Sequence, residues 1–337
     1  MKALLKEKGK ATWVMQDIAE PFLLPHENEV IIKVHSVGIC GSDLNRIRLN
    51  VEDHETIVLG HEFGGIVIQS NRPELLNNKV VVNPIISCGY CDNCMQHKTQ
   101  FCSNPILMGK NRSGAFTEKV KVPEKSVYTV PDNFDMELCC LVDGMAVINN
   151  MLSKLSMEQK NINVLIIGDG TVAACCIAGI SLKYPHSTIS IMGKHPANLE
   201  QLKEIATHHY QDFNEHSSYD LIIETVGRCQ NDTFNMAVSH IAIGGVIAIL
   251  GVYDPEFILN FNARHLFYRE AQILGVNSFV IHDQRDDFMA ALTIISNHQP
   301  LFRKIISKRF AFSSFTQALE ASITKSNGCS LKTLVTL

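Results

Sequence analysis

The sequence lacks a strong excess of either charge. Its 337 residues include 30 lysines and arginines against 34 aspartates and glutamates, which gives a formal net charge of -4 at pH 7. Charges of one sign also never form a long block. Nucleic acids and anionic membrane surfaces select basic proteins or basic patches, so neither is an expected partner.

The sequence shows no stretch typical of a secretory leader and no clear membrane span, so we expect neither. Its N-terminal stretch, MKALLKEKGKATWV, carries scattered charges and no apolar core of the kind that a leader needs. Two apolar stretches, 164–182 and 240–253, are broken by glycines or fall short of the ~20 residues that cross a bilayer. We interpret both as buried strands with their adjoining turns. A cytoplasmic protein without a membrane partner is therefore expected.

Disulfides are not the expected use of the eleven cysteines, because a long chain without a leader stays in a reducing compartment. Four of them crowd into SCGYCDNCMQHKTQFC with the spacing C-x2-C-x2-C-x7-C: Cys88, Cys91, Cys94 and Cys102. This spacing lets four thiolates close a tetrahedral shell around one zinc ion, which leaves no position for a substrate. The cluster therefore predicts a structural zinc site, with an iron–sulfur cluster as the alternative that similar spacing permits.

A second, mixed set of metal-binding residue types lies upstream. Cys40 stands in VGICGSDLNRI, and His61 and Glu62 stand together in LGHEFGG. One thiolate, one imidazole and one carboxylate suit a catalytic zinc that keeps a position open for substrate. Asp143, the one carboxylate in CCLVDGMAV, is a further candidate ligand. Taken singly, each has an ordinary interpretation: a core cysteine, a solvated loop pair, and an aspartate that caps a helix.

The stretch NVLIIGDGTVAACCIAGISL has the order of a nucleotide-binding unit: a buried strand, a glycine-rich turn and a helix. Its turn fits the dinucleotide fingerprint, in which alanine is tolerated at the third glycine position. This order predicts a dinucleotide-binding site. The cofactor-binding residues expected in it are Gly168, Gly170, Thr171, Val172 and Ala173.

The strand that follows, 187–193, carries no acidic residue at its end. In NAD-dependent enzymes a carboxylate at this place binds the 2′-hydroxyl of the adenosine ribose, whereas here Met192 and Lys194 flank Gly193. A missing carboxylate and a nearby cation favour NADP(H), with its 2′-phosphate, over NAD(H). Alternatively, Lys194 is an ordinary solvated lysine and the protein accepts both cofactors.

Three motifs, taken in their order along the chain, resemble the zinc-containing medium-chain alcohol and polyol dehydrogenases. They are C-G-S-D at 40–43, G-H-E at 60–62 and the four-cysteine stretch at 88–102, and the resemblance extends over nearly the whole chain. It implies hydride transfer between a secondary alcohol or polyol and NAD(P), with a ketone or ketose as the oxidised product. It also implies two zinc ions, one catalytic and one structural.

The resemblance further implies roles for single residues. Cys40, His61 and Glu62 would bind the catalytic zinc. Ser42 would hydrogen-bond the substrate hydroxyl and carry its proton away, and Asp43 would orient His61. Asp143 would be the fourth residue at the zinc, at a position where polyol dehydrogenases usually carry a glutamate followed by proline. The side chain is therefore one methylene shorter here.

The length suits two domains, and the resemblance assigns their folds. Residues 1–147 and 284–337 would form a GroES-like β-barrel domain that carries both zinc sites. Residues 148–283, in which strands and helices alternate as a parallel sheet requires, would form a doubly wound (Rossmann) dinucleotide-binding domain. The last strand of that domain, within 269–279, often pairs subunits in this family, so a homodimer or homotetramer is expected.

Within the family, CGSDLNRI, GHEFGG, MGKNRSGAFTE and LIIETVG look most like galactitol-1-phosphate 5-dehydrogenase and nearby polyol dehydrogenases such as sorbitol dehydrogenase. Arg46, Lys110 and Arg112 are candidate ligands for a substrate phosphate, since guanidinium groups suit bidentate phosphate binding. If they are solvated surface charges instead, the substrate is an unphosphorylated polyol or a simple secondary alcohol. The alternative of another class is a catalytically silent zinc-binding regulatory protein, whose expected sign is loss of Cys40, His61 or the glycine turn.

Overall fold

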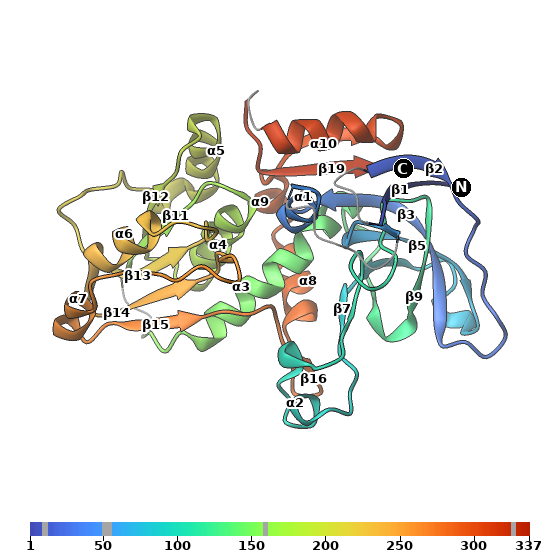
Figure 1. Ribbon diagram of the computed structural model, residues 1–337, viewed down its shortest axis with the longest axis horizontal. Helices are drawn as coiled ribbons and strands as arrows, with labels where there is room; N and C mark the ends of the chain where they lie inside the picture. The colour runs from blue at the N-terminus through green and yellow to red at the C-terminus, as the bar shows by residue number, and fades with distance from the viewer. Residues whose placement is uncertain (9–12, 49–55, 158–160, 325–327) are drawn as a thin grey trace. The chain divides into compact units, whose positions relative to one another are not determined.

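The computed structural model describes residues 1–8, 13–48, 56–157, 161–324 and 328–337, whose course Figure 1 shows. The chain divides into two compact units. The first unit contains Met1–Asp143, Val280–Asn327 and Lys332–Leu337, and the second contains Gly144–Phe279 and Gly328–Leu331. The division predicted from the sequence falls after residue 147 and before residue 284, and it assigns 328–331 to the barrel domain rather than to the second unit.

The first unit is built around a seven-stranded, mostly antiparallel sheet of order β10-β6-β5-β3-β19-β18, with β9 beside β3. Its central strand, β3, has the sequence EVIIKVHSVGI, whose valines and isoleucines favour extended backbone and fill the core. This unit has the predicted GroES-like β-barrel fold, so the predicted fold class is confirmed. The strands of the sheet are β3 (Glu29–Ile39), β5 (Glu62–Ser70), β6 (Lys79–Val82), β9 (Lys119–Pro123), β10 (Val127–Thr129), β18 (Ile306–Ala311) and β19 (Lys332–Thr336).

Smaller sheets and short helices complete the first unit. A three-stranded sheet has the order β2-β1-β4, and two hairpin-like pairs join β7 to β8 and β16 to β17. Their strands are β1 (Lys2–Lys6), β2 (Trp13–Asp17), β4 (Ile57–Val58), β7 (Ile85–Ile86), β8 (Ile106–Leu107), β16 (Ile281–His282) and β17 (Arg285–Asp286). The helices are α1 (Gly41–Arg48), α2 (Asp92–Met95), α8 (Asp287–Asn297), α9 (Gln299–Arg303) and α10 (Phe315–Thr324).

The strand register of the first unit gathers distant residues at one end of β3. Antiparallel pairing with β5 sets Gly38 opposite Glu62, and pairing with β19 sets Ile39 opposite Thr333. Cys40 follows Ile39 directly. Gly38 must lack a side chain, because a Cβ there would lie 2.8 Å from the Glu62 carboxylate. The register therefore brings Cys40, Glu62 and the first residue of β19 into one neighbourhood.

The second unit is a parallel sheet of order β12-β11-β13-β14-β15 with helices between successive strands. Figure 1 shows β11 between β12 and β13. The central strands are buried on both faces, as such sheets require. The strands are β11 (Asn163–Ile167), β12 (Thr188–Met192), β13 (Tyr219–Glu224), β14 (Ile241–Ile249) and β15 (Gln272–Gly275); the helices are α3 (Val142–Lys154), α4 (Thr171–Lys183), α5 (Pro196–Ala206), α6 (Asp232–His240) and α7 (Ala263–Arg269).

One strand of a six-stranded doubly wound sheet is reduced to a single bridge here. Ile189 of β12 and Tyr210 form an isolated parallel bridge, and the Gln211 N–H donates to the Ile189 carbonyl at 2.9 Å. The order of the sheet otherwise follows the doubly wound pattern, so β13, β14 and β15 take the places of its fourth, fifth and sixth strands.

Among the described helices, one helical stretch, Met136–Lys154, is long and apolar enough to cross a membrane. It joins a 3-10 turn to α3, and 67% of its most apolar window is buried inside the protein. Core helices pass the same test, so the stretch is weak evidence for a membrane span.

Candidate active site

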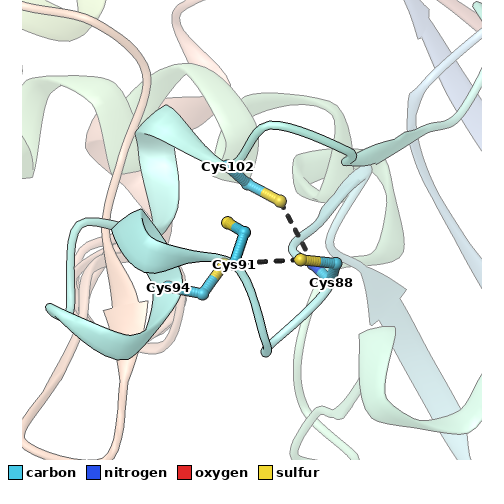
Figure 2. A group of neighbouring side chains, drawn as sticks. All are labelled: Cys88, Cys91, Cys94 and Cys102. Carbon is cyan, nitrogen blue, oxygen red and sulfur yellow. Dashed lines mark hydrogen bonds between the residues drawn. The ribbon is translucent and has the colours of Figure 1, made fainter.

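The four clustered cysteines lie close enough to share one metal ion. Their sulfur atoms all fall within 4.8 Å of one another, around the short helix α2 (Figure 2). The Cys88 and Cys94 sulfurs are 3.9 Å apart, against about 3.8 Å for tetrahedral zinc with ~2.3 Å zinc–sulfur bonds. The arrangement fits a closed zinc site, with ligands Cys88, Cys91, Cys94 and Cys102.

The thiols of this cluster differ in how readily they ionise. Hydrogen bonds from the backbone of Ser103 and of Cys94 lower the pKa of Cys91 to about 5. Burial instead raises the pKa of Cys94 to about 11. A cation bound among the four sulfurs would favour the thiolate at each of them.

The mixed ligand set assembles in the first unit. Donor atoms of Cys40, His61 and Glu62 lie within 4.8 Å of one another. Cys40 directly follows β3, His61 precedes β5, and Glu62 is the first residue of β5. One sulfur, one nitrogen and one oxygen donor fit the ligand chemistry of a catalytic zinc with an open position.

Asp43 positions two of these three residues. Its carboxylate is 2% exposed; Oδ1 lies 3.3 Å from His61 Nδ1, and Oδ2 accepts the Cys40 N–H at 3.2 Å. A histidine held through Nδ1 presents Nε2 to a metal. Burial alone would lower the pKa of His61, but Asp43 and Cys40 outweigh it and raise that pKa well above its ordinary value. Asp43 therefore orients His61, as the resemblance implies.

Asp143 lies near this set without joining it. It lies in the first turn of α3, is buried, and its Oδ1 atom has no hydrogen-bond partner among the described residues. Burial raises its pKa to about 6; the charge of His61 opposes that rise and the charge of Glu62 adds to it. Asp143 is thus electrostatically part of the site, but its oxygens fall outside the group of donors that lie within 4.8 Å.

Lys332 is a member of the site that sequence analysis missed. Its side chain is 3% exposed, and Nζ donates to Glu62 Oε2 at 2.5 Å. Burial would lower the pKa of Lys332, but the charges of Glu62 and Cys40 raise it. The ion pair leaves the other oxygen of Glu62 for a metal. The available signal was the one charged side chain in the closing strand LKTLVTL, because a lysine that is buried there needs a partner of opposite charge.

Ser42 lies at the exposed side of the ligand set. Its hydroxyl is on α1, 3.5 Å from His61 Nε2, and the side chain is open to solvent. The turn before His61 is closely packed: Gly60 has φ +91°, and a Cβ there would lie 2.4 Å from the Phe116 ring. The Phe116 ring therefore restricts the backbone at Gly60, and this restriction helps to hold His61 beside Ser42.

The three candidate phosphate ligands lie in different surroundings. Arg46 is half-buried on α1, about one turn after Asp43. Lys110 is exposed, and it follows Gly109, whose backbone packs against Gly60. Arg112 forms an ion pair with Glu29 at the first residue of β3, whereas Cys40 follows the last residue of that strand. Its guanidinium is therefore committed to a structural contact.

The dinucleotide turn lies in the second unit between β11 and α4. Gly168 has φ +123°, and a Cβ there would lie 2.1 Å from the Thr225 hydroxyl, so only glycine fits. Gly170 is the N-cap of α4. Ala173 is fully buried, and Val172 is partly exposed at the helix start. The free N–H groups at this helix N-terminus can bind a pyrophosphate. The hydroxyl of Thr171 instead donates to the Leu331 carbonyl at 2.8 Å.

A carboxylate does approach the loop after β12, from a position that sequence analysis did not consider. Asp169 of the glycine turn accepts the N–H groups of Lys194 at 2.6 Å and His195 at 2.7 Å, and its oxygens lie 3.0 Å from His195 Nδ1. Burial would raise the pKa of Asp169, but the hydrogen bonds from His195 and Lys194 lower it. Lys194 remains exposed, and Met192 is half-buried.

Comparisons with known proteins agree with this geometry. The alcohol dehydrogenase GroES-like domain matches residues 26–132. L-threonine 3-dehydrogenase of Yersinia pestis (strain Pestoides F) is 26% identical over 344 residues, covering 95% of this chain and 96% of the relative. The structure of galactitol-1-phosphate dehydrogenase from Escherichia coli has a TM-score of 0.85 at 22% identity and covers 100% of both chains. That of an alcohol dehydrogenase from Escherichia coli CFT073, in complex with NADH, has a TM-score of 0.86 at 21% identity, covering 100% of this chain and 99% of the other.

The ligand set of the first unit and the dinucleotide fold of the second define the class: an oxidoreductase linked to NAD(P). Within that class, the matched domain and the relatives that span almost the whole chain narrow the assignment. The chain contains an alcohol dehydrogenase GroES-like domain, and its likeness to dehydrogenases over almost its whole length supports a zinc-type medium-chain dehydrogenase. The predicted resemblance is confirmed.

Proposed function

We propose that the chain oxidises a secondary alcohol of a polyol to the ketone, and reduces that ketone in the opposite direction, at the site formed by Cys40, His61 and Glu62. The observation that carries this proposal is the convergence of these three donors beside the exposed hydroxyl of Ser42. A zinc ion held there would supply a Lewis acid for the substrate oxygen, and NAD(P) would supply the hydride acceptor.

The residues around the donors supply proton transfer and orientation. In the oxidation direction, the substrate hydroxyl gives its proton to Ser42 Oγ, which passes a proton on to solvent because its side chain is exposed. Bound NAD(P), held at the turn of Gly168 and Gly170, would accept the hydride from the alcohol carbon, whose bond to oxygen would become double. Asp43 holds His61 and the Cys40 backbone in place. Lys332 pairs with one oxygen of the buried Glu62 and so balances its charge.

The proposed substrate is a phosphorylated polyol. Support comes from Arg46, which follows Asp43 on α1, and from Lys110, which stands in the turn packed against Gly60. Both can carry positive charge to the neighbourhood of Ser42. Arg112 no longer supports the phosphate, because it pairs with Glu29.

Substrate and reaction are tested in one assay. The zinc-loaded protein is supplied with galactitol-1-phosphate, galactitol or L-threonine, and reduced cofactor is followed by absorbance. Preference for the phosphate ester over galactitol supports the phosphate pocket. Equal or faster turnover of galactitol refutes it, and turnover of L-threonine alone would assign the chain the activity named for its Yersinia relative. No turnover of any of the three compounds would count against the polyol proposal.

The proposed cofactor is NADP(H). Lys194 is the exposed charge at the loop after β12, and the Asp169 carboxylate is occupied by two backbone N–H groups and the His195 imidazole. The test compares kcat/KM for NADP and NAD in the wild type and in Lys194→Ala, with the exposed Lys203→Ala as the control. Loss of preference for NADP in Lys194→Ala alone supports the proposal. A wild type that prefers NAD contradicts it.

The proposed assembly is a homodimer or a tetramer built from such dimers, formed through the edge of the second unit's sheet. In the described part of the sheet, β15 is an edge strand with β14 as its neighbour. Large apolar side chains are exposed on β14, α7 and β15: Ile243, Phe267, Tyr268 and Ile273. Sedimentation should show a dimer or tetramer, and Ile273→Lys should yield monomers. A wild-type monomer would contradict the proposal.

A further inference from the structure

Glu224 is a fully buried carboxylate that the proposed reaction does not use. It is the last residue of β13, with 0% of its side chain area exposed. A buried carboxylate is costly unless it is hydrogen-bonded or paired. Its position at the carboxyl end of a central strand places it at the edge where doubly wound sheets bind their ligands.

Neutral donors from one turn and from α6 satisfy this carboxylate. Oε1 accepts the N–H groups of Val226 at 2.9 Å and Gly227 at 3.1 Å, and the hydroxyl of Thr233 at 2.8 Å. The second oxygen, Oε2, lies 3.3 Å from the same Gly227 nitrogen. The side chain thus holds the turn after β13 and ties it to α6, on which Thr233 lies.

The same residue also holds the turn after β14. Its carbonyl oxygen accepts the N–H groups of Leu250 and Gly251, both at 2.9 Å. Gly251 packs so closely that a Cβ there would lie 2.4 Å from Glu224 Oε2 and 2.3 Å from the Gly227 nitrogen. The two turns are joined again where the Arg228 N–H donates to the Val252 carbonyl at 2.8 Å. Glu224 therefore sits at the junction of two turns that follow neighbouring strands.

These turns adjoin the glycine turn on the side away from β12. Thr225 donates both its N–H and its hydroxyl to the Ile167 carbonyl at 2.9 Å, and its hydroxyl faces Gly168. A dinucleotide in a doubly wound sheet binds across the first strand, here β11. With the adenosine ribose on the β12 side, the nicotinamide half lies on the β13 and β14 side. The turns that Glu224 holds are therefore those of the nicotinamide half.

We infer that Glu224 is a positioning residue for the nicotinamide half of the cofactor. It acts through the backbone of the two turns, whose shape it sets, and it touches no reacting atom. The inference rests on the proposed cofactor binding, and it assigns the two halves of the cofactor to different parts of the second unit. The loop after β12 recognises the adenosine half, and Glu224 shapes the surface for the nicotinamide half.

The test separates the two halves of the cofactor by calorimetry. Wild type, Glu224→Gln and the exposed control Glu215→Gln are titrated with NADH and ADP-ribose, and with NADPH and 2′-phospho-ADP-ribose, since the ribose compounds lack nicotinamide. In Glu224→Gln an amide N–H replaces Oε2 and meets the Gly227 N–H, which displaces the turn. We expect Kd for the reduced cofactor to rise at least tenfold, Kd for the ribose compound to change less than twofold, and Glu215→Gln to match the wild type.

Two results would overturn the inference. Equal weakening of both ligands would show general damage to the second unit, and no weakening of either would show that Glu224 is not needed. If Glu224→Gln does not fold, Thr233→Val, which removes one donor, takes its place with an expected threefold rise in Kd for reduced cofactor alone. A wild type that binds neither ligand would refute the proposed cofactor binding itself, and with it the role of Glu224.

Discussion

The two metal-site candidates of the first unit are built in opposite ways. The four-cysteine site takes its ligands from one short stretch, 88–102, around a single helix. The mixed site takes its ligands from the ends of two strands, and its neighbours Asp43 and Lys332 come from α1 and from the closing strand. The first is local and closed, and the second is long-range and open. Local sites support the fold, whereas the open site depends on the register of the whole sheet.

The largest effect should come from removing a ligand of the open site. Cys40→Ser should lower kcat/KM by about a thousandfold, because the metal contributes several kcal/mol of transition-state stabilisation. Its melting temperature should change little. Cys94→Ser should instead lower the melting temperature and change kcat/KM little, since a structural site contributes to folding. Steady-state kinetics and thermal melts of both variants measure these effects. Similar losses in the two variants would contradict the assignment of one catalytic and one structural site.

The next largest effect concerns the long-range ion pair. Lys332→Met leaves the buried carboxylate of Glu62 without its partner, which should cost about 3 kcal/mol in the free energy of unfolding. Lys33→Met, at an exposed position of the central strand β3, is the matched control and should be nearly neutral. Urea unfolding measures both. Equal stability of the two variants would show that Glu62 does not need Lys332.

A smaller effect is expected from the carboxylate that orients the histidine. Asp43→Asn keeps the shape but weakens the contacts to His61 and Cys40, so zinc affinity at the open site should fall by roughly ten- to a hundredfold. The four-cysteine site should keep its zinc. Competition with a chelator, read separately in Cys94→Ser and Cys40→Ser backgrounds, resolves the two sites. Loss of zinc from both sites would contradict their independence.

The smallest effect should come from the proposed phosphate ligand. Arg46→Ala should raise KM for a phosphorylated polyol by about tenfold, as loss of a charge-assisted hydrogen bond predicts, and leave KM for the free polyol unchanged. Arg46→Lys should recover part of the difference, because it keeps the charge but not the planar fork. Parallel changes for both substrates would reduce Arg46 to a surface charge.

The same contrast explains what the sequence could and could not show. Spacing within a short stretch was enough to identify the four cysteines, the glycine turn and the motifs around Cys40 and His61. Lys332 lies 270 positions from Glu62, and no local pattern could join them before the strand register was known. Asp169 and Glu224 were missed for a related reason: their roles are to hold backbone N–H groups of other turns. Arg112 was a candidate phosphate ligand because it is basic and stands in the stretch MGKNRSGAFTE, but its position in the sequence does not reveal its ion pair with Glu29.

The most direct test of the central claim, one local and one long-range zinc site, is the zinc content of three proteins. Atomic emission on purified, zinc-loaded wild type, Cys40→Ser and Cys94→Ser should give two, one and one zinc ions per chain. The remaining ion in Cys40→Ser should resist chelators, and that in Cys94→Ser should support turnover while the protein stays folded. One zinc in the wild type, or loss of both ions from either variant, would contradict two independent sites.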